Sequence, residues 1–261
     1  MGEQINFGLL LKETVKLPMV RIDRDAFLRA ELSPHFDAET VNKAIAVNPA
    51  YAGITTDKIK KIANNCIDHE TTKVTTLSFA AGIPGGLAML GTVPADLAQY
   101  FGHVLRIAQK LIYLYGWQEL FDENGHMDDG TANLLTLFVG VMFGVNGATS
   151  AITKIAETAA QKTAKTLAQK ALTKGMIYPV VKKVATALGV KMTKDVFAKG
   201  VSKVIPIFGG IASGTITYVT YKPMAKKLRD HLSGLRLADA EFYRSAGEPI
   251  FTTDDFTVED V

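Results

Sequence analysis

The chain has 261 residues, of which 48% are hydrophobic and 21% are charged. This length and composition allow a sizeable buried core and exclude a chain that is disordered throughout. The single cysteine, Cys66, excludes an internal disulfide framework and a cysteine-rich zinc module.

Charge is distributed very unevenly along the chain. The formal net charge is +3, but residues 1–148 carry −4, residues 149–236 carry +13 and residues 237–261 carry −6. The basic region favours an anionic partner. The acidic C-terminal region shows little periodicity, so we predict a mobile tail over residues 237–261.

Helical periodicity dominates, and no segment alternates convincingly at a period of two, so we predict an all-α, multi-helix bundle with apolar helices rich in Gly and Ala. In the N-terminal half, capping residues, prolines and glycines mark the helix ends. The predicted helices are one from Gly2 to Lys16 that Pro18 stops, one capped by Asp23 that ends before Pro34, one capped by Asp37 that ends before Pro49, one opened by Thr56, and one from Thr92 to Tyr115 with Gly116 just past its end.

The C-terminal half follows a polar, acidic loop over residues 122–130. Its sequence is richer in Gly, Ala and Lys than the first half. The predicted elements are an apolar helix up to residues 144–147, an Ala- and Lys-rich helix over residues 149–174, a basic segment over residues 180–187, a helix capped by Thr193 that follows Gly189 and runs to Val204, and a long helix from about Gly209 to Leu232 with a kink at Pro223.

Three stretches contain neither charged residues nor histidine, namely residues 74–95, 131–153 and 204–221. A membrane-spanning helix needs about 20 mainly apolar residues, and prolines, glycines or polar residues interrupt each stretch. Glycines spaced four apart recur in all three, which suits close helix packing in lipid and in a water-soluble core alike. Both interpretations stay open here. The first residues lack the positive charge of a secretory signal, so we expect a cytoplasmic location.

Several motifs that would carry chemistry are incomplete. The His-Glu pair at 69–70 lacks the second histidine of a zinc-protease helix, because position 73 is lysine. Residues 86–92 have the glycine spacing of a phosphate-binding loop but lack its lysine. Residues 122–133 depart from a calcium-binding loop at the turn glycine and at the bidentate carboxylate. We therefore expect no metal and no cofactor, and we interpret Cys66 as a core residue.

The most informative segment is the helix predicted to end at Tyr115. At about 100° per residue, its polar side chains share a sector of roughly 100°, and its apolar side chains lie opposite. The polar row consists of Asp96, Gln99, His103, Arg106, Lys110 and Tyr113. Such a row suits a buried hydrogen-bonded network, a solvated helix face, or a site that binds an anion or transfers protons. The sequence leaves these three interpretations open.

The motifs around this helix resemble those of the EcsC family of bacterial proteins. The resemblance rests on Gly82-Ile-Pro-Gly-Gly86, Gly91-Thr-Val-Pro-Ala-Asp-Leu97, Gln109-Lys-Leu-Ile-Tyr-Leu-Tyr-Gly-Trp117, and the run from Ile205 to Gly214 followed by Tyr218 to Lys227. It implies an all-helical bacterial protein, cytoplasmic or membrane-associated, of a family linked to an ABC exporter. On this basis we predict an N-terminal helical segment over residues 1–49 and an EcsC-like helical domain over residues 50–236. The family supplies no established catalytic residues.

Two functions are compatible with these features. The first is a non-enzymatic, EcsC-type protein held peripherally at the inner face of the cytoplasmic membrane by anionic lipid, or by a membrane protein complex such as a transporter or secretion system. Its candidate membrane or anion contacts are Lys182, Lys183, Lys222, Lys226, Lys227 and Arg229. The alternative is a small-ligand-binding protein or enzyme that uses Asp96, His103 and Arg106. Nucleic acid is not expected as a partner, because the basic helices hold few aromatic residues for base stacking.

Overall fold

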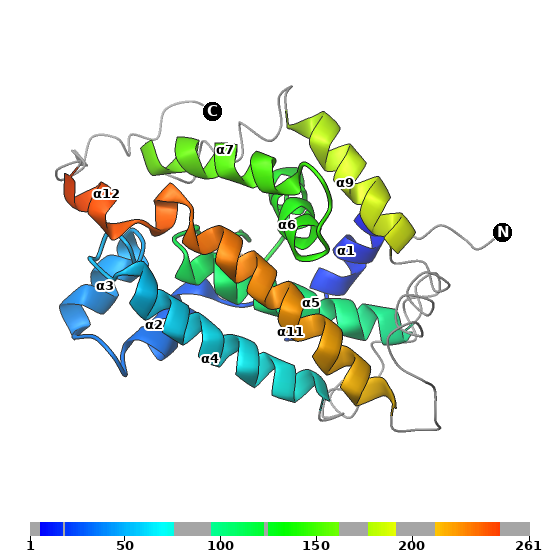
Figure 1. Cartoon of the computed structure of the whole chain (residues 1–261), viewed down its shortest axis with the longest axis horizontal. Helices are drawn as coiled ribbons and strands as arrows, with labels where there is room; N and C mark the ends of the chain where they lie inside the picture. Colours follow the sequence, from blue (N-terminus) through cyan, green and yellow to red (C-terminus); the bar gives the residue numbers. More distant parts are fainter. Residues whose placement is uncertain are drawn as a thin grey trace.

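The computed structural model describes residues 6–17, 19–75, 95–122, 125–161, 177–191 and 212–245. Within these ranges the regular structure is entirely helical, which confirms the predicted all-α class (Figure 1). The elements are α1 (Phe7–Val15), α2 (Arg24–Leu32), α3 (Ala38–Ala46), α4 (Thr56–Thr75), α5 (Ala95–Leu114), α6 (Asp129–Met142), α7 (Ala148–Gln161), α9 (Tyr178–Lys191), α11 (Ala212–Ser233), the 3-10 turn η3 (Arg236–Ala238) and α12 (Ala240–Ser245).

Short polar side chains begin several of these helices. Asn6, Asp23, Asp37 and Asp128 each accept a hydrogen bond, at 2.7 to 3.1 Å, from the backbone N–H three residues later. This bond satisfies an amide that the first helical turn leaves without an internal partner. The caps predicted at Asp23 and Asp37 are confirmed. The cap at Asn6 makes the first helix shorter than predicted, and the cap at Asp128 starts α6 inside the predicted loop.

The end of α5 is fixed by Gly116, as predicted. The N–H of Trp117 donates to the carbonyl of Ile112 at 3.1 Å, and the N–H of Gly116 donates to the carbonyl of Tyr113 at 3.2 Å. This pair of bonds is the Schellman arrangement. Gly116 has a φ of +97°, and a Cβ there would lie 2.8 Å from the carbonyl oxygen of Leu237. Glycine is therefore required both by the left-handed turn and by the close approach of the C-terminal segment.

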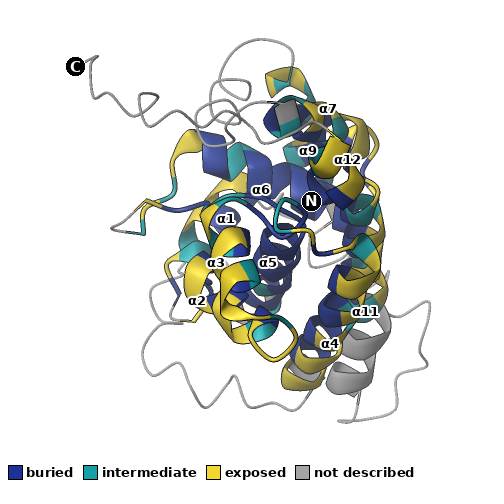
Figure 2. Ribbon diagram, turned by 90° about the vertical axis from the view of Figure 1, so that its left-hand side faces the viewer, coloured by how far each residue is buried: buried dark blue, intermediate teal, exposed yellow. Residues whose placement is uncertain are grey.

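Helix α5 runs through the centre of the bundle (Figure 2). It contacts α1, α2, α4, α6 and α11, and every residue from Phe101 to Trp117 other than Arg106 is buried. Helices α4 and α11 lie side by side and run antiparallel. Helices α1 and α2 contribute to the same hydrophobic core as α5. Within the described part of residues 6–49, the N-terminal helices thus share one hydrophobic core with α5.

The uncharged stretch over residues 131–153 is broken in its middle. Helix α6 ends at Met142 and α7 begins at Ala148, after a turn in which Gly144 and Gly147 have φ values of +64° and +89°. Among the residues that the structure describes, no helix is both long enough and apolar enough to cross a membrane. Of the other two uncharged stretches, residues 76–94 and 204–211 lie outside the described residues, and residues 212–221 form the beginning of α11 (Ala212–Ser233).

Part of the predicted mobile tail is ordered, so the boundary predicted at residue 237 is wrong. Residues 237–245 complete η3 and form α12. Leu237 and Ala238 are buried in the core, and Asn48 donates a hydrogen bond to the hydroxyl of Tyr243 at 3.1 Å. The prediction relied on the acidic charge of this region and overlooked its apolar and aromatic side chains. These side chains hold the segment against the N-terminal half.

The basic segment predicted over residues 180–187 belongs to a longer helix. Helix α9 continues through Gly189 to Lys191, so no break occurs at that glycine. Pro223 lies inside α11, in the helix where it was predicted. The Lys-rich helix predicted over residues 149–174 is observed as α7 up to Gln161. Residues 162–174, the helix predicted from Thr193 to Val204 and residues 246–261 lie outside the described residues.

Gly140 allows α9 to approach α6 closely. A Cβ at this position would lie 2.5 Å from Cγ1 of Val184 and 3.0 Å from Cβ of Ala148. Carbon atoms at optimal separation are about 3.5–4.0 Å apart. The backbone of α6 therefore packs directly against the buried face of α9, and this contact sets the position of α9 on the bundle.

Replacing Gly140 by alanine should lower the free energy of unfolding by about 1–3 kcal/mol, because the added methyl overpacks this contact. Urea denaturation followed by circular dichroism would measure the loss. The substitution Val184→Ala removes the clashing Cγ1, so the double variant should lose less stability than the two single variants combined. Strictly additive losses would show that the α6–α9 contact is not the source of the effect.

Candidate functional site

A buried carboxylate lies at the centre of the polar row. Glu70 of α4 is fully buried, and its Oε1 lies 2.8 Å from Nζ of Lys110. Its Oε2 lies 3.4 Å from Nε of Arg106, while Nζ of Lys73 lies 3.9 Å from Oε1. The side chains of Arg106 and Lys110 are only 12% and 11% exposed. Three cationic side chains from two helices thus converge on one carboxylate.

The periodicity of α4 places Glu70 in this position. Its buried residues recur with helical spacing and form one stripe against α5 and α11. The apolar members of the stripe are Ile59, Ile62, Ala63, Cys66 and Ile67. Glu70 continues the stripe by one turn, at the point where it meets the cationic side chains of α5. This placement confirms that Cys66 is a core residue.

The cations determine the protonation of Glu70. Burial on its own would raise the pKa of this carboxyl, but Lys110 and Arg106 lower it more, so the pKa lies below its ordinary value. Glu70 is therefore ionised at neutral pH. A buried ion pair with hydrogen bonds on both sides holds its partners in one geometry, and removal of one partner leaves an uncompensated charge.

His103 lies one turn before Arg106 on α5 and is 2% exposed. Tyr221 of α11 donates a hydrogen bond to the carbonyl oxygen of His103 at 3.1 Å. Burial lowers the pKa of His103 to about 4, reinforced by Arg106 and Lys73 and opposed by Glu70. The imidazole is therefore neutral at pH 7, far from the value near neutrality that suits a general acid or base.

Tyr113 pairs with a different carboxylate from that of Glu70. The hydroxyl of Tyr113 donates to Oε1 of Glu119 at 2.8 Å, and burial raises the pKa of this phenol well above its ordinary value. The side chains of Asp96 and Gln99 lie outside the described residues. For His103, Arg106 and Tyr113 the interpretation as a solvated face is wrong, because α5 is enclosed by other helices. Arg106 belongs to the cluster around Glu70, His103 is buried one turn before it, and Tyr113 makes a separate contact with Glu119.

The predicted membrane-contact residues fall into two groups. Lys182 and Lys183 of α9 and Lys226 and Lys227 of α11 are exposed. Lys222 forms an ion pair with Asp68 of α4, at 2.6 Å, and is partly exposed.

Arg229 was predicted to contact the membrane, but the structure places it away from the surface. It is 8% exposed and donates hydrogen bonds to Asp230 and to Asn64 of α4. Its guanidinium joins α11 to α4 and does not face outward, because Asn64 lies on the side of α4 that borders α11. Arg229 is therefore not a surface contact for lipid.

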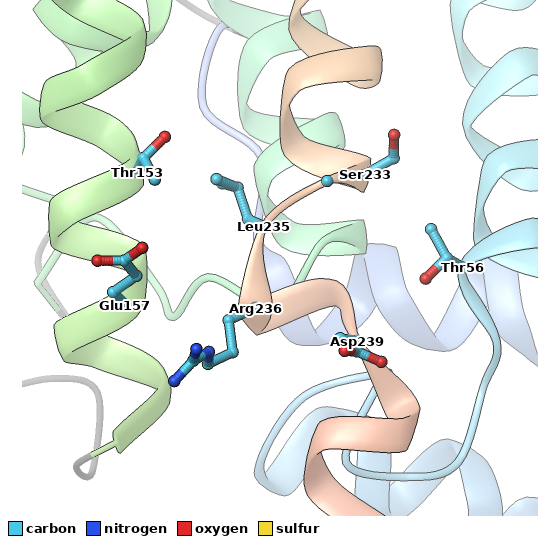
Figure 3. Close-up of a pocket in the computed structure, with 8 residues that line it drawn as sticks. Thr56, Thr153, Glu157, Ser233, Leu235, Arg236 and Asp239 are labelled. Carbon is cyan, nitrogen blue, oxygen red and sulfur yellow. The ribbon is translucent and has the colours of Figure 1, made fainter.

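A shallow cleft of about 340 Å³ lies at the opposite end of α4 from Glu70 (Figure 3). Thr153 and Glu157 of α7 line one side and Thr56 lines the other, with the segment that links α11 to α12 between them. At 1.5 Å per residue, Thr56 and Glu70 are about 21 Å apart along α4. The cleft is therefore separate from the polar row, and no sequence pattern pointed to it.

In comparisons with known proteins, no family model, no curated protein and no solved structure matches this chain. The resemblance to the EcsC family therefore stays a prediction.

The sequence analysis did not predict that Glu70 and Arg24 each connect several elements of the fold. Glu70 is recognisable as a carboxylate that continues an apolar stripe. Arg24 lies in the first turn of α2, where the helix dipole disfavours a cation. Its guanidinium is buried and donates to the carbonyl oxygens of Trp117, Ile45 and Val47 at 2.7 to 3.2 Å. It thereby joins α2, the end of α3 and the segment after α5.

Substituting alanine for Glu70 should reduce the free energy of unfolding by about 3–5 kcal/mol, since it leaves Lys110 and Arg106 buried without a counter-ion. Chemical denaturation of the variant and the parent chain would measure this difference. The matched control is Glu39→Ala, which removes the exposed carboxylate that pairs with Lys43 on α3 at 2.8 Å. Surface pairs contribute little, so the control should stay close to the parent. Equal losses in the two variants would contradict a central role for Glu70.

The burial of His103 predicts a specific pH dependence. Because its folded-state pKa of about 4 lies below the ordinary value of 6.5, the unfolded chain binds more protons between these values. Stability should therefore fall by up to about 3 kcal/mol as the pH drops from 6.5 towards 4. The variant His103→Gln should lack this component, while the contribution of Glu70 begins to fall near its ordinary pKa of 4.5 and affects the parent and the variant alike. Identical slopes for the parent and the variant between pH 6.5 and 4 would disprove the assignment.

Proposed function

We propose that this chain is a non-enzymatic, EcsC-type helical protein that binds the anionic inner face of the cytoplasmic membrane through the exposed lysines of α9 and α11. The observation that supports this most directly is the sign of the charge on these two helices. Over residues 177–189 and 221–233, six cationic side chains accompany a single carboxylate, that of Asp230. Asp230 is already paired with Arg229, and Lys60 lies 3.7 Å from it.

Lys227 borders the turn between α6 and α7, and the first residues of α9 lie beside the same turn. Nζ of Lys227 lies close to Gly144, since a Cβ on that glycine would be 2.6 Å from it. A Cβ on Gly147 would be 3.4 Å from Cγ1 of Val180, which precedes Lys182 by two residues. Both glycines have positive φ and bring the backbone close to its neighbours. The exposed lysines of α9 and α11 would each attract anionic headgroups by roughly 1 kcal/mol.

The alternative function, a ligand or catalytic site built on Asp96, His103 and Arg106, has weaker support. Within the described part of the chain, His103 is buried, and Arg106 is largely enclosed and ion-paired with Glu70. The neutral imidazole of His103 and the ion-paired guanidinium of Arg106 are already engaged in packing and charge compensation. The described geometry therefore favours a structural role for these groups.

Vesicle sedimentation tests the proposed function. The full chain should sediment with vesicles that contain phosphatidylglycerol and stay in the supernatant with neutral phosphatidylcholine vesicles. High salt should release it, because exposed charges are screened. The combined variant Lys182→Gln, Lys183→Gln, Lys226→Gln, Lys227→Gln should lose more than about tenfold in apparent affinity.

The control for this experiment removes the same number of cations from the N-terminal helices. Lys16, Arg29, Lys43 and Lys58 are exposed and are replaced together by glutamine. This variant should keep most of the affinity of the parent chain. If the parent chain does not bind anionic vesicles, or if both variants lose affinity equally, the proposal of a lipid-binding surface on α9 and α11 is wrong.

A further inference from the structure

The outward face of α9 combines an exposed aromatic ring with lysines. At about 100° per residue, Tyr178, Pro179, Lys182, Lys183 and Thr186 fall within a sector of about 140°. All of them are exposed, and Tyr178 is 49% exposed. The opposite face buries Val181, Val184 and Leu188. Helix α9 contains no acidic residue between Tyr178 and Lys191.

Tyr178 is unusual within the described part of the chain. Only Leu9, Met19 and Tyr178 are exposed there among the large hydrophobic side chains, and Tyr178 is the aromatic one. Nζ of Lys182 lies 5.5 Å from the centre of its ring, a cation–π distance that keeps the ring and the ammonium side by side. The ring is thus held outward by the helix and not folded back onto the core.

The position of this ring is fixed by the fold. The absent side chain of Gly140 lets Val184 pack onto α6, so the buried face of α9 is held nearly two turns beyond Tyr178. The first six residues of α9 therefore present the ring and two lysines on the face of the helix that points away from α6. Tyrosine places an apolar ring and a polar hydroxyl together, which suits the headgroup layer of a bilayer. Lysine places its alkyl stem in the same layer and its charge at the phosphates.

We propose that the first six residues of α9, 178–183, enter the headgroup layer of an anionic membrane, with the ring of Tyr178 inserted and with Lys182 and Lys183 on lipid phosphates. The inference rests on the proposed function, because it assumes that the basic surface meets lipid. It adds the point of insertion and the group that inserts. Charge complementarity selects anionic lipid as the occupant, since no carboxylate on α9 competes with the phosphates.

Tryptophan fluorescence tests the insertion directly. The chain has one tryptophan, Trp117, which is 4% exposed. In the double variant Trp117→Phe, Tyr178→Trp the emission reports only on position 178. Anionic vesicles should shift this emission to shorter wavelength, and lipids with brominated acyl chains should quench it. If Trp117→Phe unfolds the chain, the single variant Tyr178→Trp is compared with the parent, in which Trp117 supplies a constant background from the core.

The matched control places the reporter at another partly exposed tyrosine. Tyr51 lies between α3 and α4 and packs against Tyr243 of α12, with the ring centres 6.0 Å apart. Tyr51→Trp should show no shift and no quenching on the same vesicles. The variant Tyr178→Ser should in addition lower the apparent vesicle affinity several-fold, with its salt dependence unchanged.

The outcomes separate the two proposals. A shift with quenching at position 178, absent at position 51, supports insertion of residues 178–183. Sedimentation with anionic vesicles but no change in emission at position 178 overturns the insertion and leaves the proposed lysine surface standing. A protein that does not sediment with anionic vesicles overturns both. An equal shift at positions 178 and 51 also overturns the insertion, because it would report a general change in the fold.

Discussion

The ion pairs of Glu70 with Lys110 and Arg106 are the interaction on which the arrangement of the helices depends. Helix α5 is enclosed on all sides, yet it carries two cationic side chains in its buried part. A buried charge is tolerated only when it is paired and hydrogen-bonded. The carboxylate that meets this requirement comes from α4, so α4 must lie against α5 with Glu70 at the level of Arg106 and Lys110. The register of the α4–α11 pair follows, since Asn64 and Asp68 then face Arg229 and Lys222.

The same requirement explains the other polar contacts of α5. The side-chain amide of Gln109 accepts from the N–H of Ile22 and donates to the carbonyl of Val20, both at 2.9 Å, and so fixes the chain between α1 and α2. Tyr113 is satisfied by Glu119. The polar row of α5 is thus a set of attachment points for the surrounding elements. Lys182, Lys183, Lys226 and Lys227 differ from these groups, because they are exposed to solvent.

Much of the fold was predictable from local patterns. The caps at Asp23 and Asp37 and the glycine after α5 act within a few residues of the chain, so their effect is readable without the tertiary structure. The stripe of α4 was equally readable, and its continuation at Glu70 was a signal for a buried carboxylate. The ordered structure of residues 237–245 could not be predicted in this way, because Leu237 and Tyr243 contact residues that are far away in the sequence. Net charge is a poor guide to order when a few apolar side chains decide it.

The sequence by itself determined the all-helical class, most helix ends in the described ranges, and the presence of a polar row and a basic region. These features depend on short-range periodicity, capping and charge. Only the tertiary structure decided that His103 and Tyr113 are buried, that Arg106 pairs with Glu70, that Arg229 faces α4, and that Tyr178 is exposed beside Lys182. Each of these depends on which helix packs against which face. Contacts between residues far apart in the sequence decide which helices pack together. The ion pairs of Glu70 with the cations of α5 are the central example.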